Sequence, residues 1–252
     1  MLSPQSPLKK PVTAVSRAAH ILRYLGRVDA PAGVNTIARD LDIIPSTCLH
    51  ILRTLSHEGL TAFDPATKRY RLGSALLSLS RDALANSDFV REAKPRMDDL
   101  AERHGVTMTA TELDSTEHMV VVSIARARQI LSIHVNVGSR FPALISASGR
   151  CYAAQNNWTQ KELRPRFRAL RWQNPPIFKD WFREVAIARH DGYAIDRGHY
   201  IRGLLIAAAP VLGGEGPVIR AIAAIGFAEQ LNGKKELQLA RDVKEAAEQL
   251  SA

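Results

Sequence analysis

The sequence lacks the long apolar segments that identify membrane and secreted proteins. It contains no run of about 18 apolar residues, so it predicts no transmembrane helix. Residues 1–20 are polar and rich in proline where a secretory signal would need an apolar stretch. We therefore expect a cytoplasmic protein with no membrane partner.

Cysteine is scarce, and this argues against a zinc site or a disulfide framework. The two cysteines, Cys48 and Cys151, lie far apart among apolar neighbours, and neither has a C-x-x-C partner. We predict two buried thiols in a reducing compartment. No metal and no cofactor are expected.

Sequence motifs of common enzyme classes are also missing. There is no H-E-x-x-H, no Walker lysine loop, no G-x-G-x-x-G and no G-x-S-x-G elbow. Candidate nucleophiles are Ser148 and Cys151, with His134, His190 or His199 as a base, but no ordered His–Asp arrangement accompanies them. We expect that the protein is not an enzyme. The alternative is a hydrolase, and an esterase assay of the wild type and of Ser148→Ala would distinguish the two.

Basic residues are plentiful, and they concentrate in the first third of the chain. The formal net charge is +9. Residues 1–73 hold ten Lys and Arg against five Asp and Glu, a net +5, whereas residues 74–252 hold 24 against 20, a net +4. This distribution is typical of a chain whose first third binds phosphate.

Three helices are predicted before residue 59, after a disordered arm at residues 1–11. Apolar periodicity predicts the first helix over residues 12–27, and residues 29–33 break it. Asn35 is the expected N-cap of a short second helix. Pro45 suits the first turn of a third helix that ends near Glu58, and Gly59 follows as its C-terminal signal.

The third helix has two distinct faces. Cys48, Ile51, Leu52 and Leu55 recur at helical spacing and form one apolar stripe. The other face carries polar and basic side chains: Thr47, His50, Arg53, Thr54 and His57. This face is either solvated or in contact with a polyanion.

A β-hairpin is predicted directly after the third helix, at Thr61 to Leu72. The turn at residues 64–67 joins two short alternating runs, with Tyr70 and Leu72 on one face and three cations (Lys68, Arg69, Arg71) near the tip. Three helices and a basic hairpin make residues 12–73 a predicted winged helix-turn-helix domain.

The remainder predicts a helical linker over residues 74–86 and an α+β domain over residues 87–252. The linker has more leucines than one side needs to bury, which favours a dimer contact.

Ser87 or Asp88 is expected to cap the next helix, which ends at His104-Gly105. Pro95 predicts either a kink in this helix or two separate helices. Six further strands and four helices are predicted, with strands at 107–113, 118–126, 131–138, 194–200, 204–213 and 218–227 and helices from Ser146, Thr159, Lys179 and Gly233. This pattern favours an antiparallel sheet with flanking helices.

The chain resembles the IclR family of bacterial transcription regulators from Val12 to about Ala252. The resemblance is carried by five segments in order: "VSRAAHILRYL", "STCLHILRTLSHEGL", "DPATKRYRLG", "GSRFPALISASGRCYAA" and "HDGYAIDRGHYIRGLLIAAAPVLG". It implies a winged helix-turn-helix, a linker helix and a GAF-like effector-binding domain, in dimers that often pair into tetramers. The implied partners are double-stranded promoter DNA and a small organic acid.

The residues expected to contact DNA are Thr36, Ser46, Thr47, His50, Arg53, Lys68, Arg69 and Arg71. His50 stands where the family usually has Arg, so base recognition is expected to depend on Arg53 and the helix N-terminus. His57, on the same face, is expected to be solvated rather than to contact DNA. The alternatives are that Ser46 only caps the helix and that the hairpin cations only protect a sheet edge. A basic architectural protein that coats DNA without choosing a sequence is the other alternative; salt-dependent binding to specific and random DNA separates the two.

The effector site implied by the resemblance lies at the start of "SASGRCYA". The backbone amides of Ala147 and Ser148 match family positions that meet an anion, which agrees with the free N–H groups of a helix start. Asp196, Ile206, Ala223 and Ile225 match pocket residues, although Asp196 is alternatively a turn-capping carboxylate. Relatives that bind small oxo-acids have Cys or Ser at the last three positions. We therefore predict an apolar pocket without hydroxyl partners and an aromatic carboxylate as effector. His199 replaces the usual Glu of the family's "DRGEY" signature.

Overall fold

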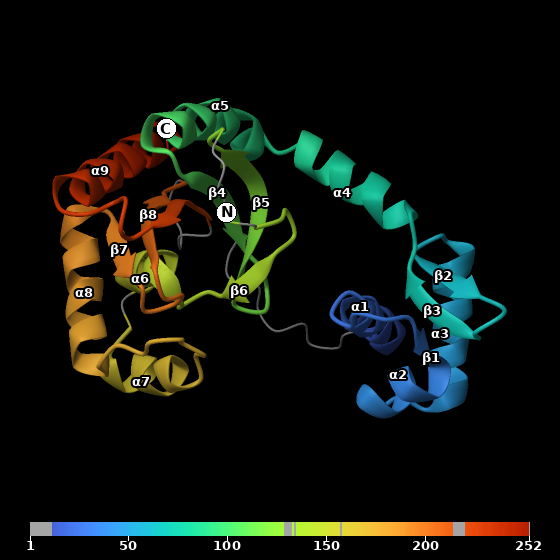
Figure 1. Ribbon diagram of the computed structural model, residues 1–252. Coiled ribbons are helices and arrows are strands. Elements are labelled where there is room, and N and C mark those ends of the chain that lie inside the picture. The colour runs from blue at the N-terminus through green and yellow to red at the C-terminus, as the bar shows by residue number, and fades with distance from the viewer. Residues whose placement is uncertain (1–11, 129–132, 134, 157, 214–219, 252) are drawn as a thin grey trace. The chain divides into compact units, whose positions relative to one another are not determined.

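The computed structural model describes residues 12–128, 133, 135–156, 158–213 and 220–251. The chain forms two compact units, Met1–Asn86 and Ser87–Ala252, and Figure 1 labels most of their helices and strands. The arm predicted at residues 1–11 lies outside the described residues. Where the chain is described, no helix is both long enough and apolar enough to cross a membrane.

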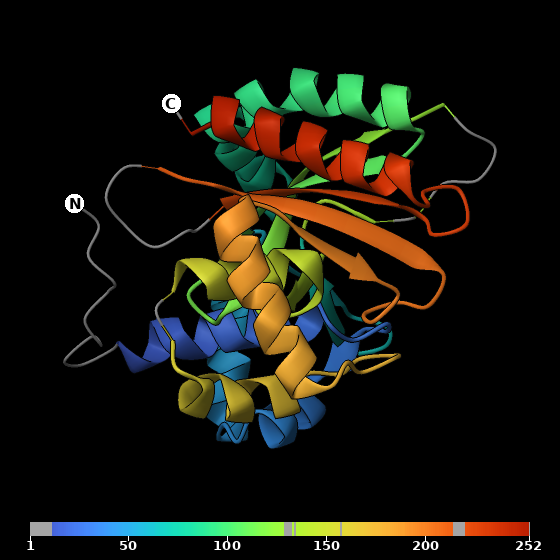
Figure 2. The same ribbon diagram turned by 90° about the vertical axis from the view of Figure 1, so that its left-hand side faces the viewer.

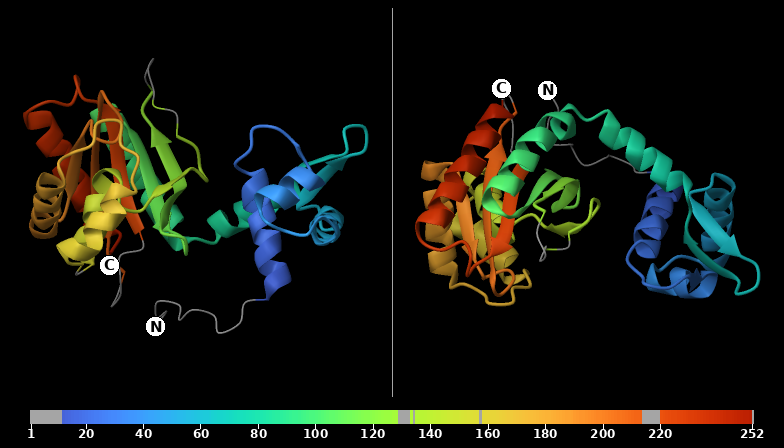
Figure 3. Two further views of the ribbon diagram at one scale, coloured as in Figure 1. Left: turned by 90° about the horizontal axis from the view of Figure 1, so that it is seen from below. Right: turned by 45° about the horizontal axis from the view of Figure 1, so that its top comes forward.

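In the first unit, the described residues form four helices and a three-stranded antiparallel sheet of strand order β1-β3-β2. The elements are α1 (Thr13–Leu25), β1 (Ala32–Gly33), α2 (Val34–Asp40), α3 (Pro45–His57), β2 (Thr61–Asp64), β3 (Arg69–Leu72) and α4 (Ala75–Ala85). The predicted hairpin is confirmed: Tyr70 pairs with Phe63 of β2 and with Ala32 of β1. The turn between β2 and β3 projects from the helices (Figure 3).

The apolar stripe of α3 is buried as its helical period predicts. Cys48, Leu52 and Leu55 are buried in the core of this unit and Ile51 is half-buried. Pro45 occupies the first turn of the helix. Backbone N–H groups have no acceptor within the helix at this position, so a residue without an N–H loses no hydrogen bond. Gly59 follows the helix with φ +69°, a left-handed conformation that favours glycine.

The start of α2 differs from the prediction. Its N-cap is Gly33 rather than Asn35, and Asn35 lies inside the first turn. The reason is β1, which the sequence pattern did not reveal. Because Gly33 pairs with Arg69 of β3, the backbone stays extended up to that residue and the helix begins directly after it.

In the second unit, the described residues form a six-stranded antiparallel sheet of order β6-β5-β4-β9-β8-β7. Its strands are β4 (Thr107–Leu113), β5 (His118–Arg126), β6 (Arg140–Pro142), β7 (Ala194–Arg197), β8 (Leu204–Val211) and β9 (Arg220–Phe227). The helices are α5 (Asp88–His104), α6 (Ser146–Gln155), α7 (Gln160–Arg168), α8 (Phe178–Asp191) and α9 (Lys234–Gln249). The α+β fold class is confirmed.

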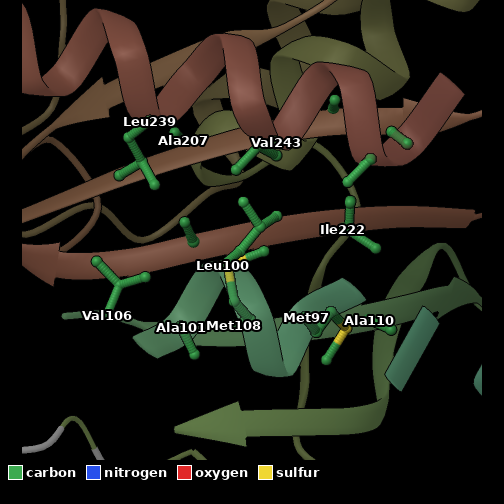
Figure 4. Packing of buried hydrophobic residues seen from close by; sticks show 14 of the residues in the cluster. Met97, Leu100, Ala101, Val106, Met108, Ala110, Ala207, Ile222, Leu239 and Val243 are labelled. Atoms are coloured by element: carbon green, nitrogen blue, oxygen red, sulfur yellow. The ribbon is translucent and has the colours of Figure 1, made fainter. Parts of the chain in front are cut away.

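The two faces of this sheet are covered by different helices (Figure 2). Helices α5 and α9 pack on one face, and the side chains that fill this layer include Met97, Leu100, Ala207, Ile222, Leu239 and Val243 (Figure 4). Helices α6 and α8 pack with the opposite face, which carries Ile206, Ala208 and Ala223. Alternation along β8 and β9 thus sends successive residues to different layers.

Two predictions for this unit are wrong. The described residues of 131–138 are not in a strand; pairing with β5 occurs instead at β6, which the sequence pattern missed. Residues 131, 132 and 134 lie outside the described residues. Ile133 and Val135 are apolar because they line a cavity described below. The second error is the division into two helices, one of the two outcomes predicted at Pro95: α5 is one continuous helix, with Ser87 as N-cap and Gly105 as C-cap.

Candidate DNA interface and effector cavity

The polar face of α3 is free of protein contacts over most of its length. Ser46, His50 and Arg53 are exposed, and Thr47 is half-buried. The N-cap of α3 is Ile44, and no side chain makes a capping hydrogen bond there. Ser46 therefore does not cap the helix, and its hydroxyl, like the first N–H groups of α3, is available to an anion or a base edge.

The hairpin turn is ordered by a carboxylate. Asp64 accepts hydrogen bonds from the Thr67 hydroxyl at 2.6 Å and from the Ala66 backbone N–H at 3.0 Å. These bonds, the one from Thr67 foremost, lower the pKa of Asp64. Lys68 completes the turn with φ +54°, a conformation uncommon for a residue with a side chain.

The cations of β3 lie on its exposed face. Arg69 and Arg71 are exposed, whereas Tyr70 between them is buried, as the alternation predicts. Arg69 also donates through Nη1 to the carbonyl oxygen of Pro31 at 3.3 Å. Its guanidinium is thus partly held by the protein, in a position beside β1.

The structure brings together three of the eight residues expected to contact DNA. Thr36, Lys68 and Arg69 line one open hollow of about 690 Å³, together with Arg27 and Tyr24 among others. The predicted residues that do not line it are Ser46, Thr47, His50, Arg53 and Arg71. Arg27 was not singled out from the sequence; its signal is a cation at the end of the first predicted helix.

A cavity of about 200 Å³ lies in the second unit, beside the N-terminus of α6. Its polar lining consists of Thr109, Ser139, Arg140, Ser146, Ser148 and Tyr200. Its apolar lining consists of Val121, Ile133, Val135, Phe141, Ile201, Leu204, Ile206, Ala223 and Ile225. Four of the six predicted effector residues line it (Ser148, Ile206, Ala223, Ile225), whereas Ala147 and Asp196 do not.

Strand register explains why residues distant in sequence meet at this cavity. Ile206 of β8 is the register partner of Ile225 of β9, and Ala223 is the partner of Thr109 of β4. Directly paired residues of antiparallel strands point to the same face. All four therefore lie on the α6 side of the sheet.

The expectation of a pocket without hydroxyl partners is wrong. Threonine and serine hydroxyls line the cavity at Thr109, Ser146 and Ser148, in addition to the cation Arg140. The prediction considered only positions in β8 and β9, and these are apolar. Thr109 comes from β4, more than 90 residues earlier, and reaches the cavity only through the β4–β9 pairing.

The first residue of α6 has an unusual environment. Ser146 is 3% exposed, has φ +64°, and its hydroxyl has no hydrogen-bond partner. Close packing confines this turn: a Cβ on Gly149 would lie 2.0 Å from the carbonyl carbon of Leu144, so only glycine fits there. Sequence reasoning named the two residues after Ser146 and missed Ser146 itself, although it belongs to the same helix start.

Asp196 is occupied by hydrogen bonds within the protein. Its Oδ1 accepts from the backbone N–H of His199 at 3.0 Å and of Tyr200 at 3.1 Å. Its Oδ2 accepts from Nη1 of Arg150 at 3.0 Å. The side chain is fully buried. These contacts are those of a turn-capping carboxylate, which was the alternative role predicted for Asp196.

His199 faces the same buried guanidinium. Its Nδ1 lies 3.1 Å from Nη2 of Arg150. Because arginine only donates, this nitrogen is the acceptor in the contact. Where the family signature has a glutamate, this chain therefore presents an imidazole nitrogen to Arg150.

Cys151 is unsuited to nucleophilic chemistry. Burial raises the pKa of its thiol to about 12, and its Sγ donates to the carbonyl oxygen of Ala208 at 3.3 Å. A thiol in this state holds almost no thiolate at neutral pH. His134, one of the candidate bases, lies outside the described residues. Within the described part of the chain, no group of three or more His, Cys, Asp and Glu side chains is placed to hold a metal ion.

Comparisons with known proteins match both units. Residues 81–252 match the family model described as the bacterial transcriptional regulator IclR C-terminal domain, and residues 14–65 match the IclR helix-turn-helix domain. A glycerol operon regulatory protein of Streptomyces coelicolor is 29% identical over 231 residues, covering 90% of this chain and 89% of that protein.

Solved structures agree in fold. An IclR transcriptional regulator from Alicyclobacillus acidocaldarius superposes with a TM-score of 0.83 at 25% identity, covering 96% of this chain and 98% of that one. An IclR homolog from Microbacterium hydrocarbonoxydans, complexed with 4-hydroxybenzoate, superposes with a TM-score of 0.73 at 19% identity, covering 95% and 98%. At that identity the likeness concerns the fold alone.

Proposed function

The chain belongs to the IclR family of bacterial transcriptional regulators, and from this premise we propose that an aromatic carboxylate, bound in the α6 cavity, controls its occupancy of promoter DNA. The family relatives are DNA-binding regulators and not enzymes. As a regulator of this kind, the protein works in the cytoplasm, where its promoter is.

On the DNA side, α3 enters the major groove and the hairpin cations contact the neighbouring backbone. Support comes from the exposure of Ser46, His50 and Arg53 along one face of α3. Arginine is the commonest reader of guanine, so Arg53 carries direct readout, whereas Lys68 and Arg69 supply phosphate contacts that position the helix.

The binding unit is a homodimer, with tetramers as a further level of assembly. All eleven residues of α4 are described, and none of them is buried within one chain. Leu77 is 72% and Leu79 is 58% exposed. A second copy that covers these leucines would place two α3 helices against a palindromic operator.

The observation that carries the effector proposal is the unpartnered, buried hydroxyl of Ser146 in a cavity with extensive apolar walls. A buried hydroxyl without a partner is destabilising, and a carboxylate would satisfy it. A cavity of roughly 150 Å³ is sufficient to hold benzene, so about 200 Å³ admits one aromatic ring with its carboxylate. Phe141, Ile206 and Ile225 supply apolar surface for the ring.

The names of relatives do not point to one compound. One relative is a glycerol operon regulatory protein, and one solved structure is an IclR homolog complexed with 4-hydroxybenzoate. The aromatic class is therefore proposed from the cavity, and the 4-hydroxybenzoate complex supplies the first compound to test.

Two experiments test the proposal. Selection of fragments from the organism's own genome, followed by footprinting, should yield a protected tract, and binding to it should exceed binding to random DNA at every salt concentration. Equal and steeply salt-dependent binding to both would instead favour the architectural alternative.

The second experiment is a thermal-shift panel with benzoate, 4-hydroxybenzoate, phenylacetate, pyruvate and glyoxylate. At least one aromatic acid should raise the melting temperature and change the affinity for the selected fragment. A response to pyruvate or glyoxylate alone would overturn the aromatic class and leave DNA binding untouched.

A further inference from the structure

Ser146 is held in a conformation that a serine rarely adopts. Its φ of +64° lies in the left-handed region, which is unfavourable for a residue with a Cβ. Such outliers persist only where surrounding contacts determine them, and they concentrate at ligand sites. Ser146 is only 3% exposed and lines the cavity. Its hydroxyl has no hydrogen-bond partner in the protein.

The contact that holds Ser146 comes from a buried arginine. Nη1 of Arg150 donates to the carbonyl oxygen of Ser146 at 2.9 Å. Arg150 is itself 0% exposed, and its Nε donates to Oε2 of Glu184 on α8 at 2.6 Å. Arg150 belongs to α6, so its planar guanidinium with fixed donors connects the first turn of this helix to α8.

The same guanidinium also supports a second segment that lines the cavity. Nη1 of Arg150 also donates to Asp196, whose other oxygen holds the backbone N–H groups of His199 and Tyr200. Tyr200 lines the cavity. The segment that carries it begins after Gly198 and ends at Gly203, both with φ +77°. Both residues are glycines in the left-handed region, and the carboxylate of Asp196 fixes the chain between them.

We infer that Ser146 donates its hydroxyl to the carboxylate of the effector, and that Arg150 is the positioning residue that holds Ser146 and the Tyr200 segment for this contact. The inference rests on the proposed function and adds a residue pair to it. Ser146 touches the ligand, and Arg150 acts through Ser146 and Asp196 without touching it. The ligand class is a monocarboxylate, because the hydroxyl of Ser146 lines the cavity at the N-terminus of α6, and the N-terminus of a helix favours an anion.

Substitutions at Ser146 separate the hydroxyl from the backbone. Ser146→Ala removes the hydroxyl and keeps a Cβ at positive φ, whereas Ser146→Gly removes both. Both should weaken binding of the best acid in the panel about 10- to 100-fold, the loss expected for one hydrogen bond to a charged group. The melting temperature should differ between them, with the glycine variant higher. Ser123→Ala, a buried serine of β5 that does not line the cavity, is the matched control and should leave affinity unchanged.

The positioning role of Arg150 is tested with Arg150→Lys, which keeps the charge and loses the fork of donors. Calorimetric titration with the acid and with its neutral amide (benzoate and benzamide, for example) gives the ratio of the two affinities. A change in stability alone would not alter this ratio. Wild-type protein should prefer the acid, and this preference should fall about tenfold or more in Ser146→Ala and in Arg150→Lys. Both variants should still bind the selected DNA fragment without ligand and should keep the wild-type tryptophan fluorescence, which comes from the second unit, so that both units are shown to be folded.

The outcomes are distinct. Equal acid affinity in wild type and both Ser146 variants overturns the inference and leaves the proposed function standing. An Arg150→Lys variant that binds DNA and retains the wild-type preference for acid over amide overturns the positioning role. If wild-type protein binds none of the acids, the proposed effector class fails and the inference fails with it.

Discussion

Arg150 and Asp196 form an ion pair that is closed to solvent, with Nη1 of the guanidinium 3.0 Å from Oδ2 of the carboxylate and side-chain exposures of 1% and 0%. The two residues are 46 positions apart in sequence. Glu184, which is 31% exposed, is the second carboxylate on the same guanidinium. The arrangement connects α6, α8 and β7 through one side chain.

Removing one member of this pair should destabilise the second unit. Asp196→Ala leaves a buried guanidinium partly uncompensated, and such changes cost about 3–5 kcal/mol. We expect about 3 kcal/mol, because Glu184 remains as a partner. All three tryptophans (Trp158, Trp172, Trp181) belong to the second unit, so their fluorescence during urea unfolding reports that unit.

The matched control for this prediction removes both charges. Arg150→Met combined with Asp196→Leu should unfold at a higher urea concentration than Asp196→Ala alone, because no uncompensated buried cation is left. An Asp196→Ala variant that unfolds at the wild-type urea concentration would show that the ion pair contributes little to stability.

Substitution of Arg53 should weaken specific DNA binding without unfolding the protein. Arg53 is exposed on α3, so Arg53→Ala removes no core contact. A lost guanine contact should reduce affinity for the selected fragment by about 1–3 kcal/mol and relax the base preference at one position. Gel-shift titration and a melting curve measure the two effects separately.

His57→Ala is the control on the same helix, because His57 is exposed in its last turn and is expected only to be solvated. It should bind with wild-type affinity. If Arg53→Ala also binds as tightly as wild type, α3 does not read bases through this residue.

Lys68 should contribute to affinity equally on every DNA sequence. Because Lys68 has φ +54°, Lys68→Gly removes the charge and suits the turn, so the hairpin should remain folded. Binding to specific and random fragments should weaken together, and the slope of log affinity against log salt should fall by about 1. A weakening confined to the specific fragment would contradict a phosphate contact.

Local sequence patterns were sufficient for most of the fold. Helical spacing identified the buried stripe of α3 around Cys48 and Leu52, and alternation identified β3 with Tyr70 inward. Both predictions succeed because the spacing of apolar residues within one helix or strand identifies the side that packs against the core. The helix ends at Ser87 and Gly105 could be predicted equally well, since each cap depends on residues next to it.

The site was less readable because its geometry arises from contacts between distant residues. Ile206, Ala223 and Ile225 were grouped by the family resemblance, and the pairing of neighbouring strands brings all three to one cavity. Thr109 joins them only through β4–β9 pairing. The left-handed backbone of Ser146 depends on its surroundings, including a carbonyl contact from Arg150, and no local pattern encodes it. The apolar alternation of residues 131–138 resembled a strand because Ile133 and Val135 face a cavity.

Acid should destabilise the second unit through Asp114. This carboxylate closes the turn between β4 and β5; burial raises its pKa, but hydrogen bonds from Thr116, His118 and Arg140 outweigh that effect and lower the pKa to about 2. A carboxylate whose pKa is lower in the folded than in the unfolded chain stabilises the fold above the unfolded value of 3.8. That stabilisation, about 2 kcal/mol at neutral pH, is lost as the pH falls from about 4 to about 2.

Urea unfolding of wild type and Asp114→Asn across this pH range tests the assignment. The difference in unfolding free energy should be about 2 kcal/mol at pH 7 and should shrink toward zero near pH 2, because protonation removes the charge from the wild-type side chain. Ser115→Ala, at the exposed neighbouring position of the same turn, should leave stability nearly unchanged at every pH. A gap between wild type and Asp114→Asn that stays constant from pH 7 to pH 2 would mean that the side chain stabilises the turn by shape and hydrogen bonding alone, independent of its ionisation.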